Sequence, residues 1–96
     1  MYILITYDIS TETPEGKRRL RHVCQACKDF GQRVQFSVFE FDLDDAKLEI
    51  VKHRLLELIE PKEDSIRIYR LRGNRDEVIE CHGIDKYVDF DGPLLF

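Results

Sequence analysis

Apolar and polar residues follow patterns that predict strands and helices in alternation. Six of the first seven residues are apolar or aromatic, which predicts a buried strand that ends at Asp8. Between residues 20 and 30, apolar side chains recur at three- and four-residue steps, the period of a helix with one apolar face. Thr13, followed by a proline, predicts the N-cap of this helix, and Gly31 predicts its end.

The segment 32–43 is rich in β-forming residues, but its alternation changes phase near Ser37–Val38. A bulge in one strand would account for the change, but we favour two short strands joined at that point. Asp44 then predicts the cap of a second helix, which ends at Pro61. The residues of this helix expected to face inward are Leu48, Val51, Leu55 and Leu58.

Ser65–Leu71 alternates cleanly and predicts a further strand, and a short strand is expected at Val78–Cys81. The apolar ending Gly92–Phe96 is expected to dock onto something, such as a partner subunit. The predicted order is β-α-β-β-α-β with an extra C-terminal strand. This order indicates an α+β, ferredoxin-like fold, in which two helices cover one face of an antiparallel four-stranded sheet. Residues 1–96 are expected to form a single domain.

Composition narrows the cellular context. No apolar stretch approaches the roughly 20 residues that cross a bilayer, so no membrane contact is expected. The N-terminus lacks the layout of a signal peptide, so we expect a cytoplasmic protein. Disulfides are not expected there, although the chain has three cysteines. Cys24 and Cys27 have the spacing of half a zinc or redox site, but both fall on the apolar helix face, and we interpret them as core residues.

The charge balance is unusual for a protein that would bind phosphates. The formal net charge is −4, which argues against general affinity for nucleic acids. Basic residues nevertheless gather at 17–21 and at 67–75. Arg18 and Arg19 in the first group would either follow a phosphate backbone or form a solvated first turn.

The second basic group contains an aromatic residue. Strand alternation places Arg67 and Tyr69 on one face and Arg70 on the other. A basic side chain beside an aromatic ring forms a platform for a phosphate and a base. Charge that protects an edge strand from aggregation explains the pattern equally well, so both interpretations remain open.

Asp8 is the leading candidate for chemistry, because a carboxylate at the end of a buried strand is rigidly held and accessible to a ligand. The alternative is that Asp8 only opens the following turn. One carboxylate does not hold Mg²⁺ firmly by itself, since such sites use one or two carboxylates with waters and substrate phosphates. A symmetric dimer would solve this by bringing two copies of Asp8 together across a two-fold axis.

Four segments of the chain resemble a known family. They are Leu4–Asp8, the Gln-Arg-Val-Gln and Ser-Val-Phe motifs within Gly31–Glu40, Asp64–Leu71, and Gly92–Phe96. Together they are similar to the second of the universal CRISPR-associated proteins, the small nuclease-like subunit of the spacer-adaptation machinery. The resemblance extends over nearly the whole chain.

The resemblance implies a ferredoxin-like homodimer whose residues 77–96 cross to the other subunit. It implies that Asp8 binds Mg²⁺ or Mn²⁺ for endonuclease cleavage of RNA or DNA. In the family's adaptation role, the dimer bridges integrase subunits and holds duplex DNA. The expected phosphate contacts are Arg18, Arg19, Arg33 and Arg70, and the residues expected to shape the site are Tyr7, Ser37 and Phe39.

The sequence is therefore compatible with three functions. The first is a metal-dependent phosphodiesterase centred on Asp8. The second is a catalytically silent bridge that spaces integrase subunits, for which the apolar ending 92–96 would be the critical element. The third is a ferredoxin-like toxin ribonuclease, which would need no integrase partner. We favour a nuclease-family protein that works in adaptation.

Overall fold

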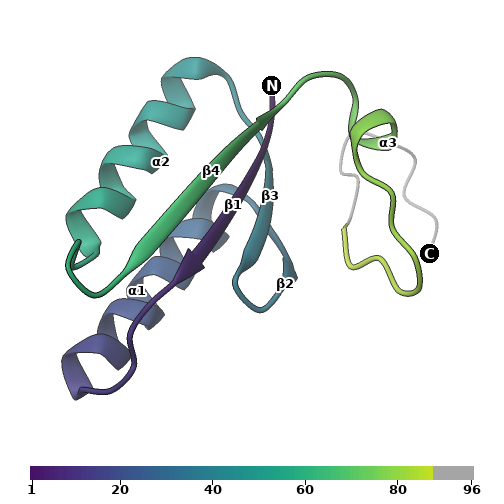
Figure 1. Ribbon diagram of the computed structural model, residues 1–96. Helices are drawn as coiled ribbons and strands as arrows, with labels where there is room; N and C mark the ends of the chain where they lie inside the picture. The colour runs from purple at the N-terminus through teal and green to yellow at the C-terminus, as the bar shows by residue number, and fades with distance from the viewer. Residues whose placement is uncertain (88–96) are drawn as a thin grey trace.

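The computed structural model describes residues 1–87 and has a four-stranded antiparallel sheet in the order β2-β3-β1-β4. Two helices, α1 and α2, lie together on one side of the sheet, and a short helix, α3, lies apart from them (Figure 1). This arrangement confirms the predicted ferredoxin-like α+β fold. The strands are β1 Tyr2–Asp8, β2 Gln32–Gln35, β3 Val38–Asp42 and β4 Ser65–Leu71; the helices are α1 Pro14–Phe30, α2 Asp45–Leu58 and α3 Arg75–Val78.

The central strand β1 decides which side chains enter the core. It pairs with β3 from Tyr2 to Thr6 and with β4 along its whole length. Because side chains alternate along a strand, Ile3 and Ile5 point toward the helices and are fully buried. We call this side of the sheet the helix-covered face, and the opposite side, which carries Leu4, Thr6 and Asp8, the open face.

Both predicted helix starts are confirmed by their caps. The Thr13 hydroxyl accepts a hydrogen bond from the Gly16 N–H at 3.1 Å, and the Asp44 carboxylate accepts one from the Lys47 N–H at 2.8 Å. The inward residues of α1 and α2 join one core with those of the sheet. The interpretation of Cys27 as a core residue is also confirmed, since it is fully buried and burial raises the pKa of its thiol to about 12.

The predicted change of phase between residues 32 and 43 is real. β2 and β3 form a hairpin, and their pairing shifts register between Arg33 and Gln35. Phe39 and Phe41 of β3 share one face by the ordinary alternation of a strand, and both are almost fully buried in the core. Two short strands, rather than one long strand, therefore lie between α1 and α2.

The prediction of a strand at Val78–Cys81 is wrong. Arg75–Val78 form α3, and no strand follows it up to residue 87. A strand needs a neighbouring edge to pair with, whereas this segment crosses the open face of the sheet. Asp76 and Glu77 also favour the start of a helix, because their negative charges lie next to the positive N-terminal end of its dipole and are attracted to it. The apolar ending at 92–96 lies outside the described residues.

A buried carboxylate ties the loop before β4 to the start of α1. Asp64 accepts hydrogen bonds from the N–H groups of Ser10 (3.0 Å) and Glu60 (2.9 Å). It also forms an ion pair with Arg19, whose Nε lies 2.8 Å away. Burial raises the pKa of this carboxyl, but the hydrogen bonds from Glu60 and Arg19 outweigh burial and hold the pKa below its ordinary value.

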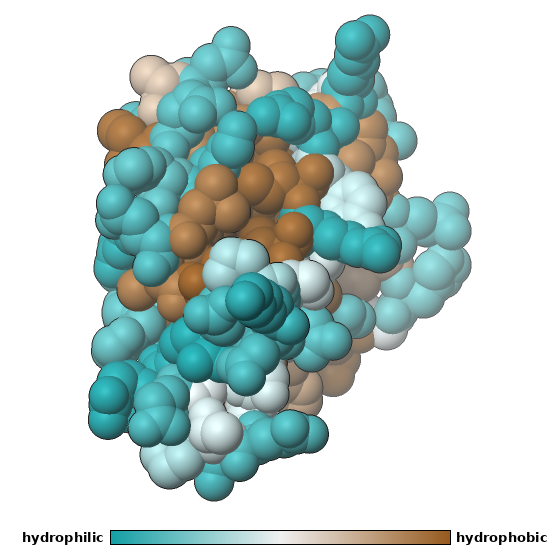
Figure 2. Space-filling view, turned by 60° about the vertical axis from the view of Figure 1, so that its left-hand side comes forward, coloured by the Kyte–Doolittle hydropathy of each residue, from teal (hydrophilic) through white to brown (hydrophobic). Residues whose placement is uncertain are grey.

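The outer surface is mixed in character. Figure 2, which turns the left-hand side of Figure 1 forward, shows a hydrophobic patch framed by hydrophilic side chains. Among the large hydrophobic residues, Ile50 and Leu56 of α2 are exposed. Within residues 1–87, no helix has the length and apolar character to span a membrane.

We predict that Asp64→Asn lowers the free energy of unfolding by about 1–3 kcal/mol at neutral pH, because buried N–H groups lose an acceptor. A carboxyl whose pKa is depressed in the folded state stabilises the protein above its unfolded pKa, and this stabilisation is lost as pH falls through the folded pKa. The variant should therefore lose less stability than wild type between about pH 5 and pH 2. Urea unfolding across this range measures both effects.

The control for this prediction is Glu63→Gln. Glu63 pairs with the same Arg19 at 2.9 Å, but its side chain is 51% exposed. An exposed pair contributes little, so this variant should unfold close to wild type. Equal destabilisation by the two changes would contradict a special role for the buried carboxylate.

We also predict that Gly16→Ala destabilises the protein, although alanine favours a helix over glycine by about 1 kcal/mol. Gly16 is buried at the start of α1, and a Cβ there would collide with the carbonyl oxygen of Ser10. The expected net loss is about 1–3 kcal/mol, the usual result of overpacking. Thermal unfolding measures it, with the exposed neighbour Lys17→Ala as the control. A higher melting temperature for Gly16→Ala would disprove the steric argument.

Candidate metal and nucleic-acid site

Asp8 is the last residue of β1 and lies exposed on the open face of the sheet. In the antiparallel ladder it stands opposite Ser65, the first residue of β4. Its strand is held from both sides, by β3 and by β4. The carboxylate is therefore presented to solvent from a rigid element, as the sequence predicted.

The ladder places Ser65 opposite Asp8, and Arg67 and Tyr69 follow along the same face of β4. A hollow at this end of the open face is lined by Thr6, Asp8, Ser65, Arg67 and Tyr69, together with Tyr7. Arg67 stands opposite Thr6, and its Nη1 donates a hydrogen bond to the Tyr69 hydroxyl at 3.3 Å. The sequence placed Arg67 and Tyr69 on one face, but did not connect them with Asp8. The signal that would have connected them is the pairing of β1 with β4.

Arg19, one of the expected phosphate contacts, is committed to carboxylates. Its guanidinium pairs with the buried Asp64 and with Glu63. Its side chain is 19% exposed. These contacts give Arg19 a structural role that joins α1 to the loop before β4.

The other three predicted arginines lie on different elements. Arg18 is exposed on α1. Arg33, on β2, donates to the Phe36 carbonyl at 3.1 Å and to Cys24 Sγ at 2.9 Å, and its Cζ lies 5.5 Å from the centre of the Phe39 ring. Arg70 is exposed opposite Ile3, on the other face and at the other end of β4 from Asp8. The structure therefore does not gather these arginines around Asp8.

The three residues expected to shape the site support β1 from behind. The rings of Tyr7 and Phe39 stack in the core with their centres 6.2 Å apart. The Tyr7 N–H donates to the Ser37 carbonyl at 3.2 Å, and burial raises the pKa of the Tyr7 hydroxyl to about 12. These contacts fix the end of β1 against the β2–β3 turn. They position the strand that carries Asp8, but the Tyr7 and Phe39 rings face the helices.

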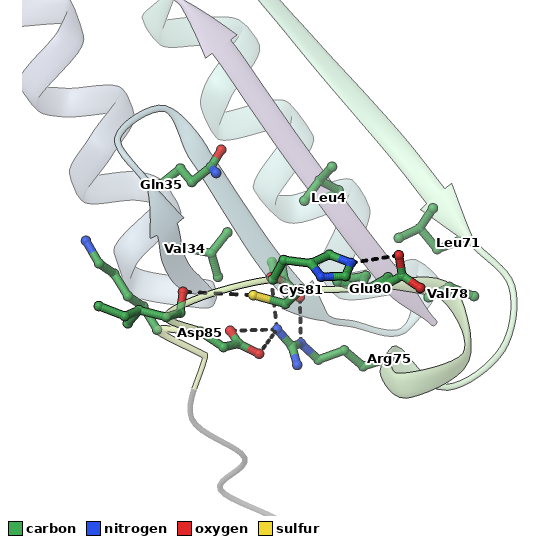
Figure 3. Close-up of a pocket in the computed structure, with 14 residues that line it drawn as sticks. Leu4, Val34, Gln35, Leu71, Arg75, Val78, Glu80, Cys81 and Asp85 are labelled. Atoms are coloured by element: carbon green, nitrogen blue, oxygen red, sulfur yellow. Dashed lines mark hydrogen bonds and ion pairs between the residues drawn. The ribbon is translucent and has the colours of Figure 1, made fainter.

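A second hollow lies on the open face beneath the segment that contains α3 (Figure 3). Here the buried Glu40 accepts hydrogen bonds from Tyr2 and from Arg75, both at 2.8 Å. Arg75 also pairs with Asp85 at 2.9 Å and lies 4.0 Å from the centre of the Tyr87 ring. Burial lowers the pKa of Arg75, but pairing with Glu40 and Asp85 raises it further than burial lowers it. This cluster ties residues 75–87 to the sheet.

Asp8 is the carboxylate that this end of the open face offers to a divalent metal. Within the part of the chain that the structure describes, no three His, Cys, Asp or Glu side chains come together as a metal cluster. A cation such as Mg²⁺ binds through one or two carboxylates, with waters and substrate phosphates as its other ligands. A single exposed Asp8 meets the minimum of one carboxylate for such a site.

Comparison with known proteins identifies the family of the chain. The family model described as CRISPR associated protein Cas2 matches residues 1–79. A protein of Moorella thermoacetica named CRISPR-associated endoribonuclease Cas2 1 is 59% identical over 95 residues, covering 99% of both chains. A protein of Halalkalibacterium halodurans named CRISPR-associated endonuclease Cas2 is 45% identical over 96 residues, covering 100% of both.

A solved structure supports the same conclusion. Cas2 from Streptococcus pyogenes matches with a TM-score of 0.76 and 51% sequence identity, covering 86% of this chain and 100% of that one. Fold and sequence therefore agree over β1 to β4, the part of the chain that carries Asp8. The chain belongs to the Cas2 family of CRISPR-associated proteins.

Proposed function

We propose that this chain is a CRISPR spacer-adaptation subunit that acts in the cytoplasm as a homodimeric, metal-dependent endonuclease on RNA or duplex DNA. The observation that carries the proposal is the position of Asp8, exposed at the end of the central strand. Relatives of nearly the same length bear the names endoribonuclease and endonuclease.

In this proposal, Asp8 and the Asp8 of a second copy hold one Mg²⁺ or Mn²⁺ between them. When bound, such an ion activates a water and neutralises charge on the scissile phosphate. The protein's own part is to keep the two carboxylates in place. The paired strand β1 and the contacts of Tyr7 behind it supply that rigidity.

The open face is the surface that we propose for dimerisation. It carries the partly buried Leu4 and Leu71, whose apolar side chains a second copy would cover. An interface around a two-fold axis uses the same patch on both subunits, so residues at one end of this face meet their own copies. Residues 77–96 are proposed to cross to the partner and to extend this contact.

Nucleic acid would approach the dimer along its exposed basic side chains. Of the arginines that the sequence singled out, Arg18, Arg33 and Arg70 are exposed, whereas Arg19 is paired with the buried Asp64. Arg33 already donates hydrogen bonds to the Phe36 carbonyl and to Cys24 Sγ. We propose that phosphate contacts from Arg18 and Arg70 position the duplex, with further contacts from the integrase subunits that the dimer bridges. The net charge of −4 favours this sharing of the binding.

A catalytically silent bridge is the second candidate function. The observation that favours it is that no cluster of three His, Cys, Asp or Glu side chains that could hold a metal exists within residues 1–87. In that case, the dimer would serve only to space integrase subunits, and Asp8 would be a turn residue.

The first prediction is that Asp8→Asn lowers Mg²⁺- or Mn²⁺-dependent cleavage by at least about 100-fold, because the metal loses a charged ligand. Labelled single-stranded RNA and duplex DNA are the substrates. Because Asp8 is exposed, the melting temperature without metal should stay near wild type. Cleavage that persists at full rate in the variant would refute the nuclease proposal.

Asp42→Asn is the matched control for this assay. Asp42 is also an exposed aspartate at the end of a strand, and it stands opposite Tyr2 at the far end of β1. Its side chain is 65% exposed, and its carboxylate lies 3.5 Å from the N-terminal amine. Cleavage by this variant should match wild type, since the change is far from the proposed metal.

The second prediction separates the nuclease from the bridge. If the bridge is the function, Asp8→Asn retains spacer acquisition, and deletion of residues 92–96 abolishes association with the integrase subunit or with the second copy. Size-exclusion chromatography with light scattering measures the assembly, and sequencing of arrays measures acquisition. Normal assembly after the deletion would count against the bridge.

A further inference from the structure

We propose that Arg67 is the phosphate-positioning residue of the Asp8 site and that Tyr69 holds its guanidinium in place. This inference rests on the proposed binding of nucleic acid at Asp8 and adds a residue to that site. It also assigns the position of the phosphate relative to the sheet: above β4, on the open face.

The register of the sheet places Arg67 next to Asp8. Asp8 stands opposite Ser65. Arg67 lies two residues after Ser65 and is therefore the next side chain on the same face of β4. Such diagonal neighbours have Cβ atoms about 7 Å apart, within the reach of an arginine side chain. All of these side chains line one hollow.

The charge of Arg67 is not neutralised by a carboxylate in residues 1–87. Arg19 pairs with Asp64, Arg54 with Asp29, and Arg75 with Glu40 and Asp85. Arg67 instead donates a hydrogen bond to the neutral hydroxyl of Tyr69, at 3.3 Å. An arginine guanidinium stays protonated at physiological pH, so this neutral partner leaves the positive charge of Arg67 uncompensated.

The geometry leaves Arg67 free to bind an anion. A guanidinium has five N–H donors, and the Tyr69 hydroxyl uses one of them, so a bidentate contact with phosphate remains available. Arg67 and Asp8 both line the hollow, and the side-chain hydrogen bond that Arg67 makes there goes to Tyr69. The Tyr69 ring is 40% exposed and can stack on a base. The hollow therefore combines an acid, a cation and an aromatic ring.

Protection of an edge strand is the competing explanation. β4 lies at one edge of the sheet, and charged side chains commonly protect such edges from aggregation. This explanation requires only that Arg67 be charged and solvated. It does not require the hydrogen bond to Tyr69, and it predicts self-association, not weaker binding of RNA, when the charge is removed.

The test measures how binding depends on salt. The full-length protein carrying Asp8→Asn, which should not cleave, binds labelled single-stranded RNA between about 50 and 200 mM salt. Adding Arg67→Gln should reduce the slope of log K against log salt by about 0.7 for each Arg67 that contacts a phosphate. Arg67→Lys should keep the slope, because the charge remains, but bind less tightly, because the bidentate contact is lost. Tyr69→Phe should also keep the slope and bind less tightly.

Arg54→Gln is the matched control, because it removes the same charge from α2 on the far side of the sheet, where Arg54 pairs with Asp29. Its slope should equal that of the parent protein. An unchanged slope in Arg67→Gln, self-association as its only effect, or no measurable RNA binding by the parent would each overturn the proposal. Failure of the nuclease function shows separately, as undiminished cleavage in Asp8→Asn.

Discussion

The pairing of β1 on both of its edges is the constraint on which the rest of the structure depends. Because β3 and β4 both run antiparallel to β1, one alternation of side chains is fixed across all three strands. Ile3 and Ile5 enter the core under the helices, and Asp8 emerges on the open face. A shift of the register by one residue would exchange these two sets and remove both the core and the site.

Much of the fold could be predicted because its signals are local. The caps at Thr13 and Asp44 and the break between β2 and β3 depend on residues close together in the chain. The expected strand at 78–81 failed for the opposite reason: a strand is defined by a neighbouring edge, which the segment itself does not reveal.

The candidate site was predictable only in part. Asp8 was found because the end of a strand is visible in the sequence. Arg19 looked available for phosphate, but its partner Asp64 lies 45 residues away and is buried in the fold. The neighbourhood of Arg67 and Asp8 depends on the register between β1 and β4, which no short motif encodes. The sequence pattern alone therefore predicts poorly the role of a residue whose contacts lie far away in the sequence.

The cluster around Glu40 limits how residues 75–87 can move. Glu40 is buried beneath this segment, and Arg75 is the cation that compensates its charge. If the segment left the sheet, the carboxylate would need water or another cation, because a buried uncompensated charge is strongly destabilising. The segment 75–87 is therefore held to the sheet by charge as well as by packing, and any condition that weakens the Arg75–Glu40 ion pair would loosen the cover over this part of the open face.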